Sequence, residues 1–144
     1  VVLCDGPADP DDEPEIIENI REIIKKDIPV FAIGLGHQML ALANDFKIIK
    51  MDKGHRGSNQ PVRIESADKI MITDQNHGYA ADKNTVSDKA KVIMTNVNDD
   101  TVEGLEYNNF KGLSVQFTPK GDEDSSTGFI IRDFFKMMDG ENNE

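Results

Sequence analysis

The chain has 144 residues, of which 38% are hydrophobic and 30% charged, so it is long enough to bury the core of one domain. Its 16 basic and 27 acidic side chains leave a formal net charge of −11, which argues against nucleic acid and anionic membranes as partners, because both require a basic surface. A single cysteine, Cys4, excludes an internal disulfide and fits a reducing compartment. No apolar run approaches ~20 residues, so we expect a cytoplasmic protein without a membrane span.

The first third of the chain alternates strand and helix patterns. Residues 1–4 form a short apolar run that ends in a turn, and residues 28–33 form a continuous apolar run typical of a strand covered on both faces. Between them, residues 15–26 carry isoleucines at the spacing of an amphipathic helix, with acidic residues early and lysines late. A helix rich in leucine and alanine is predicted over 37–44. This order predicts a parallel sheet with right-handed crossovers.

The rest of the chain has the character of antiparallel β-structure. Polar turns separate short strand-like runs, a hairpin follows with residues 98–100 at its turn, and one amphipathic helix comes near the end. The predicted strands are 46–51, 62–64, 70–73, 91–97, 102–107 and 113–117, the helix is 129–138, and 139–144 are expected to form a disordered tail. The sequence therefore predicts an α/β fold: an open, mostly parallel sheet with flanking helices and an added antiparallel portion.

The stretch over residues 28–38 is the centre of the functional argument. A buried strand runs through a Gly-Leu-Gly turn directly into a helix, which is the geometry of a nucleophile elbow. The residue at the tip of such a turn lies above the carboxyl ends of the strands, where open α/β sheets bind ligands. Here the tip is Gly34, which has no side chain.

Five ordered stretches carry a family resemblance. They are Asp-Gly-Pro-Ala-Asp-Pro at 5–10 (family Asn-Gly-Pro-Gly-Asp-Pro), Ala-Ile-Gly-Leu-Gly-His-Gln at 32–38, Gly-His-Arg-Gly-Ser-Asn-Gln-Pro-Val at 54–62, Asp-Gln-Asn-His-Gly-Tyr at 74–79 and Ser-Val-Gln-Phe-Thr-Pro-Lys at 114–120. Together they resemble the class I glutamine amidotransferases, in pattern nearest to the glutaminase (small) subunit of carbamoyl-phosphate synthetase. The resemblance implies a flavodoxin-like fold whose first strands are missing here, so we expect residues 1–144 to be a single amidotransferase-like domain that is partial at its N-terminus.

The resemblance also assigns three catalytic positions, and none carries the family residue. The family hydrolyses glutamine through a thioester, which needs a thiolate, a base that activates it and backbone donors for the oxyanion. The resemblance places the nucleophile at Gly34, the histidine at Thr118 and the glutamate at Lys120. Glycine supplies no nucleophile, threonine cannot cycle a proton near neutral pH, and lysine inverts the charge that should stabilise an imidazolium. We therefore expect no glutaminase activity.

The substrate-binding positions are better kept. The resemblance implies that the backbone N–H groups of Ala8 and Leu35 would form the oxyanion hole, although the family has glycine at position 8. It also implies that Gln38 and three further residues would contact the amino-acid end of glutamine. The three further residues are Asn76, Gly78 and Tyr79. The alternative is that Gln38 merely caps a helix and that residues 76–78 merely form a turn.

The other reactive side chains have plain interpretations. Cys4 is expected to be a small buried strand residue, and His37 a hydrogen-bonding residue at a helix terminus. His55 and His77 are expected in loops. The histidines show no metal-ligand spacing, so the sequence predicts no metal site and no cofactor.

Three functions remain open. The first is a pseudo-glutaminase that serves as a structural, regulatory or partner-binding module, docks on the large ATP-grasp subunit of a synthetase in arginine or pyrimidine biosynthesis, and still binds L-glutamine. The second is an active glutamine-hydrolysing subunit that supplies ammonia to carbamoyl-phosphate synthetase. The third is a free-standing amino-acid-binding module. Ammonia release separates the second from the others, and binding without a large partner favours the third.

Overall fold

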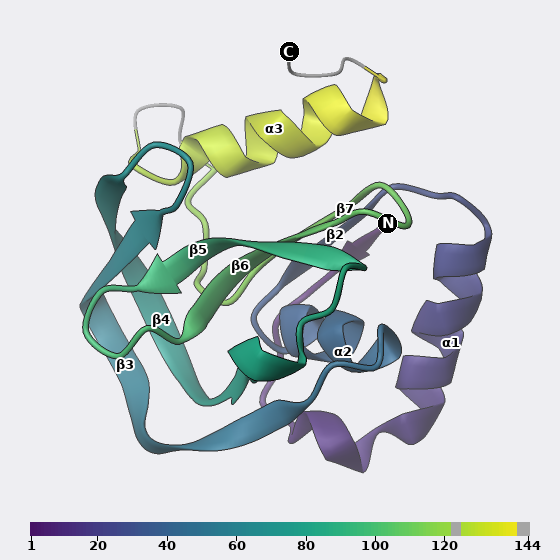
Figure 1. Cartoon of the computed structure of the whole chain (residues 1–144), viewed down its shortest axis with the longest axis horizontal. Coiled ribbons are helices and arrows are strands. Elements are labelled where there is room, and N and C mark those ends of the chain that lie inside the picture. Colours follow the sequence, from purple (N-terminus) through teal and green to yellow (C-terminus); the bar gives the residue numbers. More distant parts are fainter. Residues whose placement is uncertain (122–124, 141–144) are drawn as a thin grey trace.

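The computed structural model describes residues 1–121 and 125–140. In this part of the chain, one curved sheet has the strand order β1-β2-β7-β6-β5-β3-β4, with helices on its two faces (Figure 1). The strands are β1 (Val2–Leu3), β2 (Val30–Ile33), β3 (Ile48–Ile64), β4 (Lys69–Ala81), β5 (Ala90–Asn96), β6 (Val102–Tyr107) and β7 (Gly112–Val115). The helices are α1 (Pro14–Lys25), α2 (Leu35–Ala43) and α3 (Gly128–Met138), with short 3-10 turns at Pro10–Asp12 and Lys83–Thr85.

The sheet has a parallel and an antiparallel part. β1, β2 and β7 pair in parallel, whereas β7 to β6, β6 to β5, β5 to β3 and β3 to β4 are antiparallel. The predicted α/β class with an added antiparallel portion is confirmed, and in the described residues that portion is the larger one.

Side chains of β2 alternate between two apolar cores. Val30 and Ala32 pack with α1 and α2 on one face of the sheet, in a core that includes Ile20 and Leu40. Phe31 points to the other face, where its ring stacks on Phe134 of α3 at a centroid distance of 5.2 Å. The continuous apolar run of β2 is explained because both of its faces are covered.

The region after α2 corrects the sequence prediction. Instead of short strands with polar turns between them, β3 and β4 form one long antiparallel ribbon, and the polar stretches at 54–60 and 74–79 lie inside its strands. His55 and His77, expected in loops, face each other across this ribbon. The register shifts between Lys50 and His55 and again between Gly57 and Gln60. Such bulges break the two-residue alternation on which strand prediction depends.

The terminal elements agree with the pattern of the sequence. The β5–β6 hairpin and the amphipathic helices α1 and α3 form where they are predicted, within a few residues at each end. The predicted disordered tail lies outside the described residues from position 141 onward. Among residues 1–121 and 125–140, no helix combines the length and the hydropathy needed to cross a membrane.

Candidate functional site

The turn between β2 and α2 has the strained geometry of an elbow. Gly34 has φ 57° and ψ −116°, a left-handed conformation that glycine adopts without the steric penalty of a side chain. Its N–H donates to the carbonyl of Val115 on β7 (3.0 Å), and its carbonyl accepts from the N–H of Gln38 (3.2 Å). The helix therefore begins at Leu35, two residues earlier than predicted, and Gly34 projects no group into the site.

The carboxylate of Asp5 fills the space beside this turn. Its Oδ1 accepts hydrogen bonds from the backbone N–H groups of Leu35 (2.8 Å) and Gly6 (2.9 Å). A Cβ atom at position 34 would collide with this carboxyl group in its present rotamer. Sequence reasoning did not single out Asp5; the only available signal was its place at the start of the 5–10 stretch, where the family has asparagine.

A hollow of about 460 Å³ lies next to the elbow. Its walls come from the loop after β1, the start of α2 and the β3–β4 ribbon. The structure brings together in it all the residues predicted to bind substrate or an oxyanion, with the charged groups of Asp5, Asp9 and Arg56 among them. Those predicted residues are Ala8, Leu35, Gln38, Asn76, Gly78 and Tyr79.

Gln38 joins three elements under this hollow. The side chain is buried, and its Nε2 donates to the carbonyl of Tyr79 on β4 (3.0 Å) and to Oε1 of Gln116 after β7 (3.0 Å). The amide of Gln38 therefore holds the wall of the hollow in place. On the rim, the Asp9 carboxylate is hydrogen-bonded to the phenol of Tyr79 and raises the pKa of that hydroxyl.

The other two family-equivalent catalytic positions lie outside the hollow. Thr118 is exposed, and its backbone N–H donates to the carbonyl of Asp74 (3.0 Å). The ammonium of Lys120 lies 3.5 Å from Oδ2 of the same Asp74. Neither residue lines the hollow beside Gly34. The structure thus places Thr118 and Lys120 in contact with Asp74 on β4.

Cys4 and His37 offer no replacement for the missing groups. Cys4 is exposed, so the prediction of a buried strand residue was wrong: β1 ends at Leu3, and Cys4 lies just beyond it. His37 is fully buried in the first turn of α2, where its Nδ1 lies 2.7 Å from the hydroxyl of Ser114 on β7. Burial lowers the pKa of His37 to about 3, so the ring is neutral and shielded from solvent.

The remaining histidines meet a carboxylate behind the hollow. His55 on β3, His77 on β4 and Glu103 on β6 each place one possible metal-ligand atom within 4.8 Å of the others. Hydrogen bonding to Glu103 and Asp99 raises the pKa of His55 to about 9, against the opposing effect of burial. Burial lowers the pKa of His77. Sequence spacing missed this cluster because strand pairing, not sequence distance, brings its members together.

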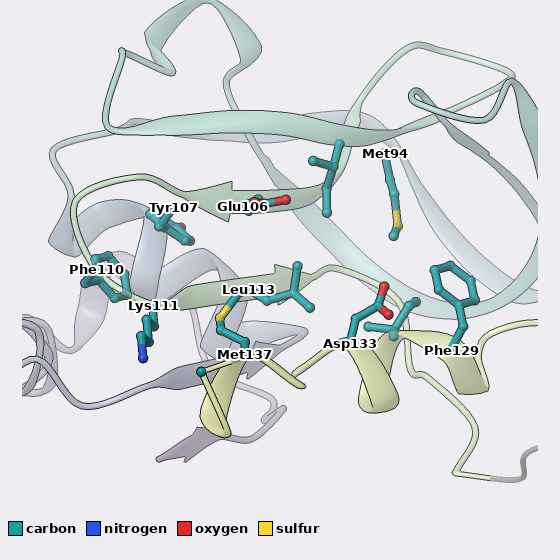
Figure 2. Close-up of a pocket in the computed structure, with 12 residues that line it drawn as sticks. Met94, Glu106, Tyr107, Phe110, Lys111, Leu113, Phe129, Asp133 and Met137 are labelled. Atoms are coloured by element: carbon teal, nitrogen blue, oxygen red, sulfur yellow. The ribbon is translucent and has the colours of Figure 1, made fainter. Parts of the chain in front are cut away.

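A larger hollow of about 680 Å³ lies elsewhere, between α3 and strands β5 to β7. Figure 2 shows that it is bordered mainly by apolar and aromatic side chains, such as Met94, Leu113 and Phe129, together with the charged side chains of Glu106, Lys111 and Asp133. It contains none of the residues predicted to act on or bind a substrate. The smaller polar hollow at the elbow is therefore the candidate functional site.

Known proteins resemble this chain in sequence and in fold. The model of the family "Glutamine amidotransferase class-I" matches residues 1–138. The carbamoyl phosphate synthase small chain of Lactococcus lactis subsp. lactis is 44% identical over 142 residues, and that of Listeria monocytogenes serovar 1/2a is 41% identical over 142 residues. The alignments cover 96% and 97% of this chain but 39% of each relative, so the chain spans well under half the length of the curated relatives it matches.

Solved structures agree on the architecture. A protein assigned as a GMP synthase subunit of Thermoplasma acidophilum has a TM-score of 0.80 at 20% identity, over 96% of this chain and 72% of that chain. A glutamine amidotransferase from Thermotoga maritima has a TM-score of 0.67 at 22% identity, over 81% of this chain and 55% of that chain. At these identities the likeness shows the fold alone. Because the family model matches residues 1–138 of this 144-residue chain, the chain belongs to the class I glutamine amidotransferases.

Proposed function

We propose that the chain is a catalytically inactive glutaminase-like domain, similar to the small subunit of carbamoyl-phosphate synthetase, that acts as a structural, regulatory or partner-binding module and still binds L-glutamine. One observation carries the proposal: at the elbow, Gly34 supplies no nucleophile, and the Asp5 carboxylate lies where that nucleophile would start.

The oxyanion donor is also engaged. Acyl transfer builds negative charge on the substrate oxygen, and catalysis requires preorganised N–H groups that face it. The N–H of Leu35 donates to Asp5 instead, at 2.8 Å. A carboxylate in this position also repels a developing oxyanion. Loss of hydrolysis therefore has two causes at the elbow, of which the second depends on the first, because Asp5 occupies the space that Gly34 leaves.

The positions that correspond to the family's base and its orienting carboxylate supply neither group here. Thr118 cannot accept a proton near neutral pH, and Lys120 pairs with Asp74. His37 is buried behind the turn and hydrogen-bonded to Ser114. The three substitutions at 34, 118 and 120 thus remove each role of the triad in turn.

Binding of an amino acid fits the hollow better than hydrolysis does. A free amino acid carries one carboxylate and one ammonium group, and the hollow offers Arg56 for the first and Asp9 for the second. The amide side chain of glutamine requires both hydrogen-bond donors and acceptors, which Asn76 and neighbouring backbone groups can supply. A volume of about 460 Å³ leaves room for such a ligand.

The relatives suggest the setting of this module. Because they are carbamoyl phosphate synthase small chains, we place residues 1–144 as one amidotransferase-like domain beside a large ATP-grasp synthetase subunit of arginine or pyrimidine biosynthesis in the cytoplasm. A domain without glutaminase activity could dock there while the synthetase uses free ammonia.

The test is a calorimetric titration of the chain with L-glutamine, combined with an ammonia assay on the same sample. We expect saturable binding and no ammonia above the buffer rate. Binding that disappears in Asn76→Ala would place the ligand in this hollow. Ammonia release above the buffer rate would overturn the proposal, and no binding at all would refute its ligand-binding part and leave a docking module.

A further inference from the structure

The cluster behind the hollow brings together groups that hold lone pairs. His55 and His77 are directly opposite each other in the β3–β4 register, and Glu103 comes from β6. Nδ1 of His55 lies 3.4 Å from Oε1 of Glu103 and 3.1 Å from Oε1 of Gln75. Nε2 of His77 lies 2.6 Å from the same Gln75 oxygen. Four side chains from three strands therefore converge on one point.

The contact between His77 and Gln75 brings two acceptor atoms together. Nδ1 of His77 lies 2.8 Å from the carbonyl of Tyr79, which can only accept, so this nitrogen carries the hydrogen and Nε2 of the neutral ring carries a lone pair. Nε2 of Gln75 donates to the hydroxyl of Thr73 (3.0 Å), and that hydroxyl donates its own hydrogen to the carbonyl of Gln60 (2.9 Å). In this orientation two acceptors, Oε1 of Gln75 and Nε2 of His77, face each other at 2.6 Å. A cation bound at this point relieves the contact, as does rotation of the amide together with the Thr73 hydroxyl.

The outer contacts orient both imidazoles as metal ligands. Nε2 of His55 lies 2.8 Å from Oδ2 of Asp99, so this nitrogen donates outward and Nδ1 points to the cluster. His77 is held in the same way by the carbonyl of Tyr79. Metal-binding histidines characteristically donate their second N–H to a carboxylate or a backbone carbonyl, which fixes the tautomer and the ring orientation.

Glu103 supplies a buried anionic ligand. Its side chain is fully buried, and within the described part of the chain Oε2 has no hydrogen-bond partner. Among the described residues, Oε1 accepts a 3.2 Å hydrogen bond from Asn96 and contacts His55. A buried carboxylate requires a nearby cation. In the metal-free chain the protonated His55 is that cation, and a metal ion bound here would release its proton.

We propose that His55, His77, Glu103 and Gln75 bind one first-row divalent metal ion, with zinc as the best match. Two imidazole nitrogens, a carboxylate and an amide oxygen form a donor set that such ions accept. Donors in a tetrahedral zinc site are roughly 3.3 Å apart, close to the 3.1 and 3.4 Å found around Nδ1 of His55. The 2.6 Å between Nε2 of His77 and Oε1 of Gln75 is shorter, so these two atoms must move apart when the ion binds. The ion would fasten β3, β4 and β6 together behind the wall of the hollow. The inference does not depend on the proposed function, because it involves neither hydrolysis nor glutamine.

The test uses the 144-residue chain stripped with a chelator and then titrated with Zn²⁺ in excess Mg²⁺, which suppresses binding to the acidic surface. We expect one equivalent of zinc per chain. We also expect at least about a tenfold loss of affinity in His77→Gln and in Glu103→Gln. The matched control is Glu106→Gln, an exposed glutamate on the same strand, which should leave the affinity unchanged.

Two outcomes overturn the proposal: the unmodified chain takes up no zinc in excess Mg²⁺, or His77→Gln binds zinc as tightly as the unmodified chain does. Glu103 is fully buried, so its variant is used only if circular dichroism shows that it folds. Co²⁺ provides a readout that needs no variant. We expect the intense visible absorption of a four-coordinate site in the unmodified chain, and a spectrum of hexaaqua cobalt alone would contradict the assignment.

Discussion

Replacing Gly34 by a residue with a side chain should destabilise the domain. Gly34 lies at φ 57° and ψ −116°, where a non-glycine residue costs on the order of 1–3 kcal/mol. A Cβ there also displaces the Asp5 carboxylate, whose hydrogen bonds to the Leu35 and Gly6 N–H groups contribute roughly 0.5–1.5 kcal/mol each at most. Because Asp5 is exposed and can rotate into water, we expect the strain to dominate.

The prediction is a loss of about 1–3 kcal/mol in the free energy of unfolding for Gly34→Ala and Gly34→Cys. For a chain of this size, that corresponds to a fall in Tm of roughly 3–10 °C. Thermal unfolding followed by circular dichroism measures it, and an ammonia assay on Gly34→Cys should show no turnover, because Thr118 and Lys120 still supply no base.

The controls separate strain from the general effect of adding a methyl group. Gly121→Ala adds a Cβ that meets no atom of the described residues within 4 Å, and it should change Tm little. Adding Asp5→Ala to Gly34→Ala removes the collision and leaves the strain, so most of the loss should remain. A Gly34→Ala variant with unchanged or higher Tm would refute the elbow geometry at this position.

Three further predictions follow from single contacts. The pKa of His37 is about 3 in the folded chain and 6.5 for a free imidazole, so between these pH values the unfolded chain binds a proton that the folded chain does not. The free energy of unfolding should therefore fall as the pH drops from 6.5 toward 3, by up to about 1.4 kcal/mol per pH unit. In denaturant titrations, His37→Asn should show a shallower dependence of this free energy on pH. Asn76→Ala should weaken L-glutamine binding in calorimetry with little change in Tm, because residue 76 is exposed. Gln38→Ala should weaken binding and also lower Tm, because its buried amide holds β4 and Gln116 in place. Equal losses of Tm in the two variants would contradict these separate roles. Lys120→Ala should change stability by less than about 1 kcal/mol, because its ion pair is exposed, and a larger loss would mean that position 120 has a structural role.

Local patterns predicted the elements whose apolar periodicity is regular. The isoleucines of α1 repeat at helical spacing, and Ile20 among them is buried against α2. β2 reads as a continuous apolar run because the sheet is covered on both faces there. The elbow was predictable as well, because the buried strand at 28–33 leads through a Gly-Leu-Gly turn directly into a helix.

Features that depend on long-range pairing could not be predicted in the same way. The β3–β4 ribbon carries polar residues through two register shifts, so neither alternation nor hydrophobicity marks its length. His55, His77 and Glu103 are distant in sequence, and only the pairing of β3 with β4 and the position of β6 place them together. The hydrogen bond from Leu35 to Asp5 spans 30 residues and depends on the space that Gly34 leaves.

The most direct test of catalytic inactivity is ammonia release from saturating L-glutamine by the unmodified chain, measured against buffer alone. We expect the same rate in both, because Gly34 lacks a nucleophile and the Leu35 N–H is bonded to Asp5. Release above the buffer rate that scales with protein concentration and is lost in Asn76→Ala would contradict this central claim and would mean that another group in the hollow performs the chemistry.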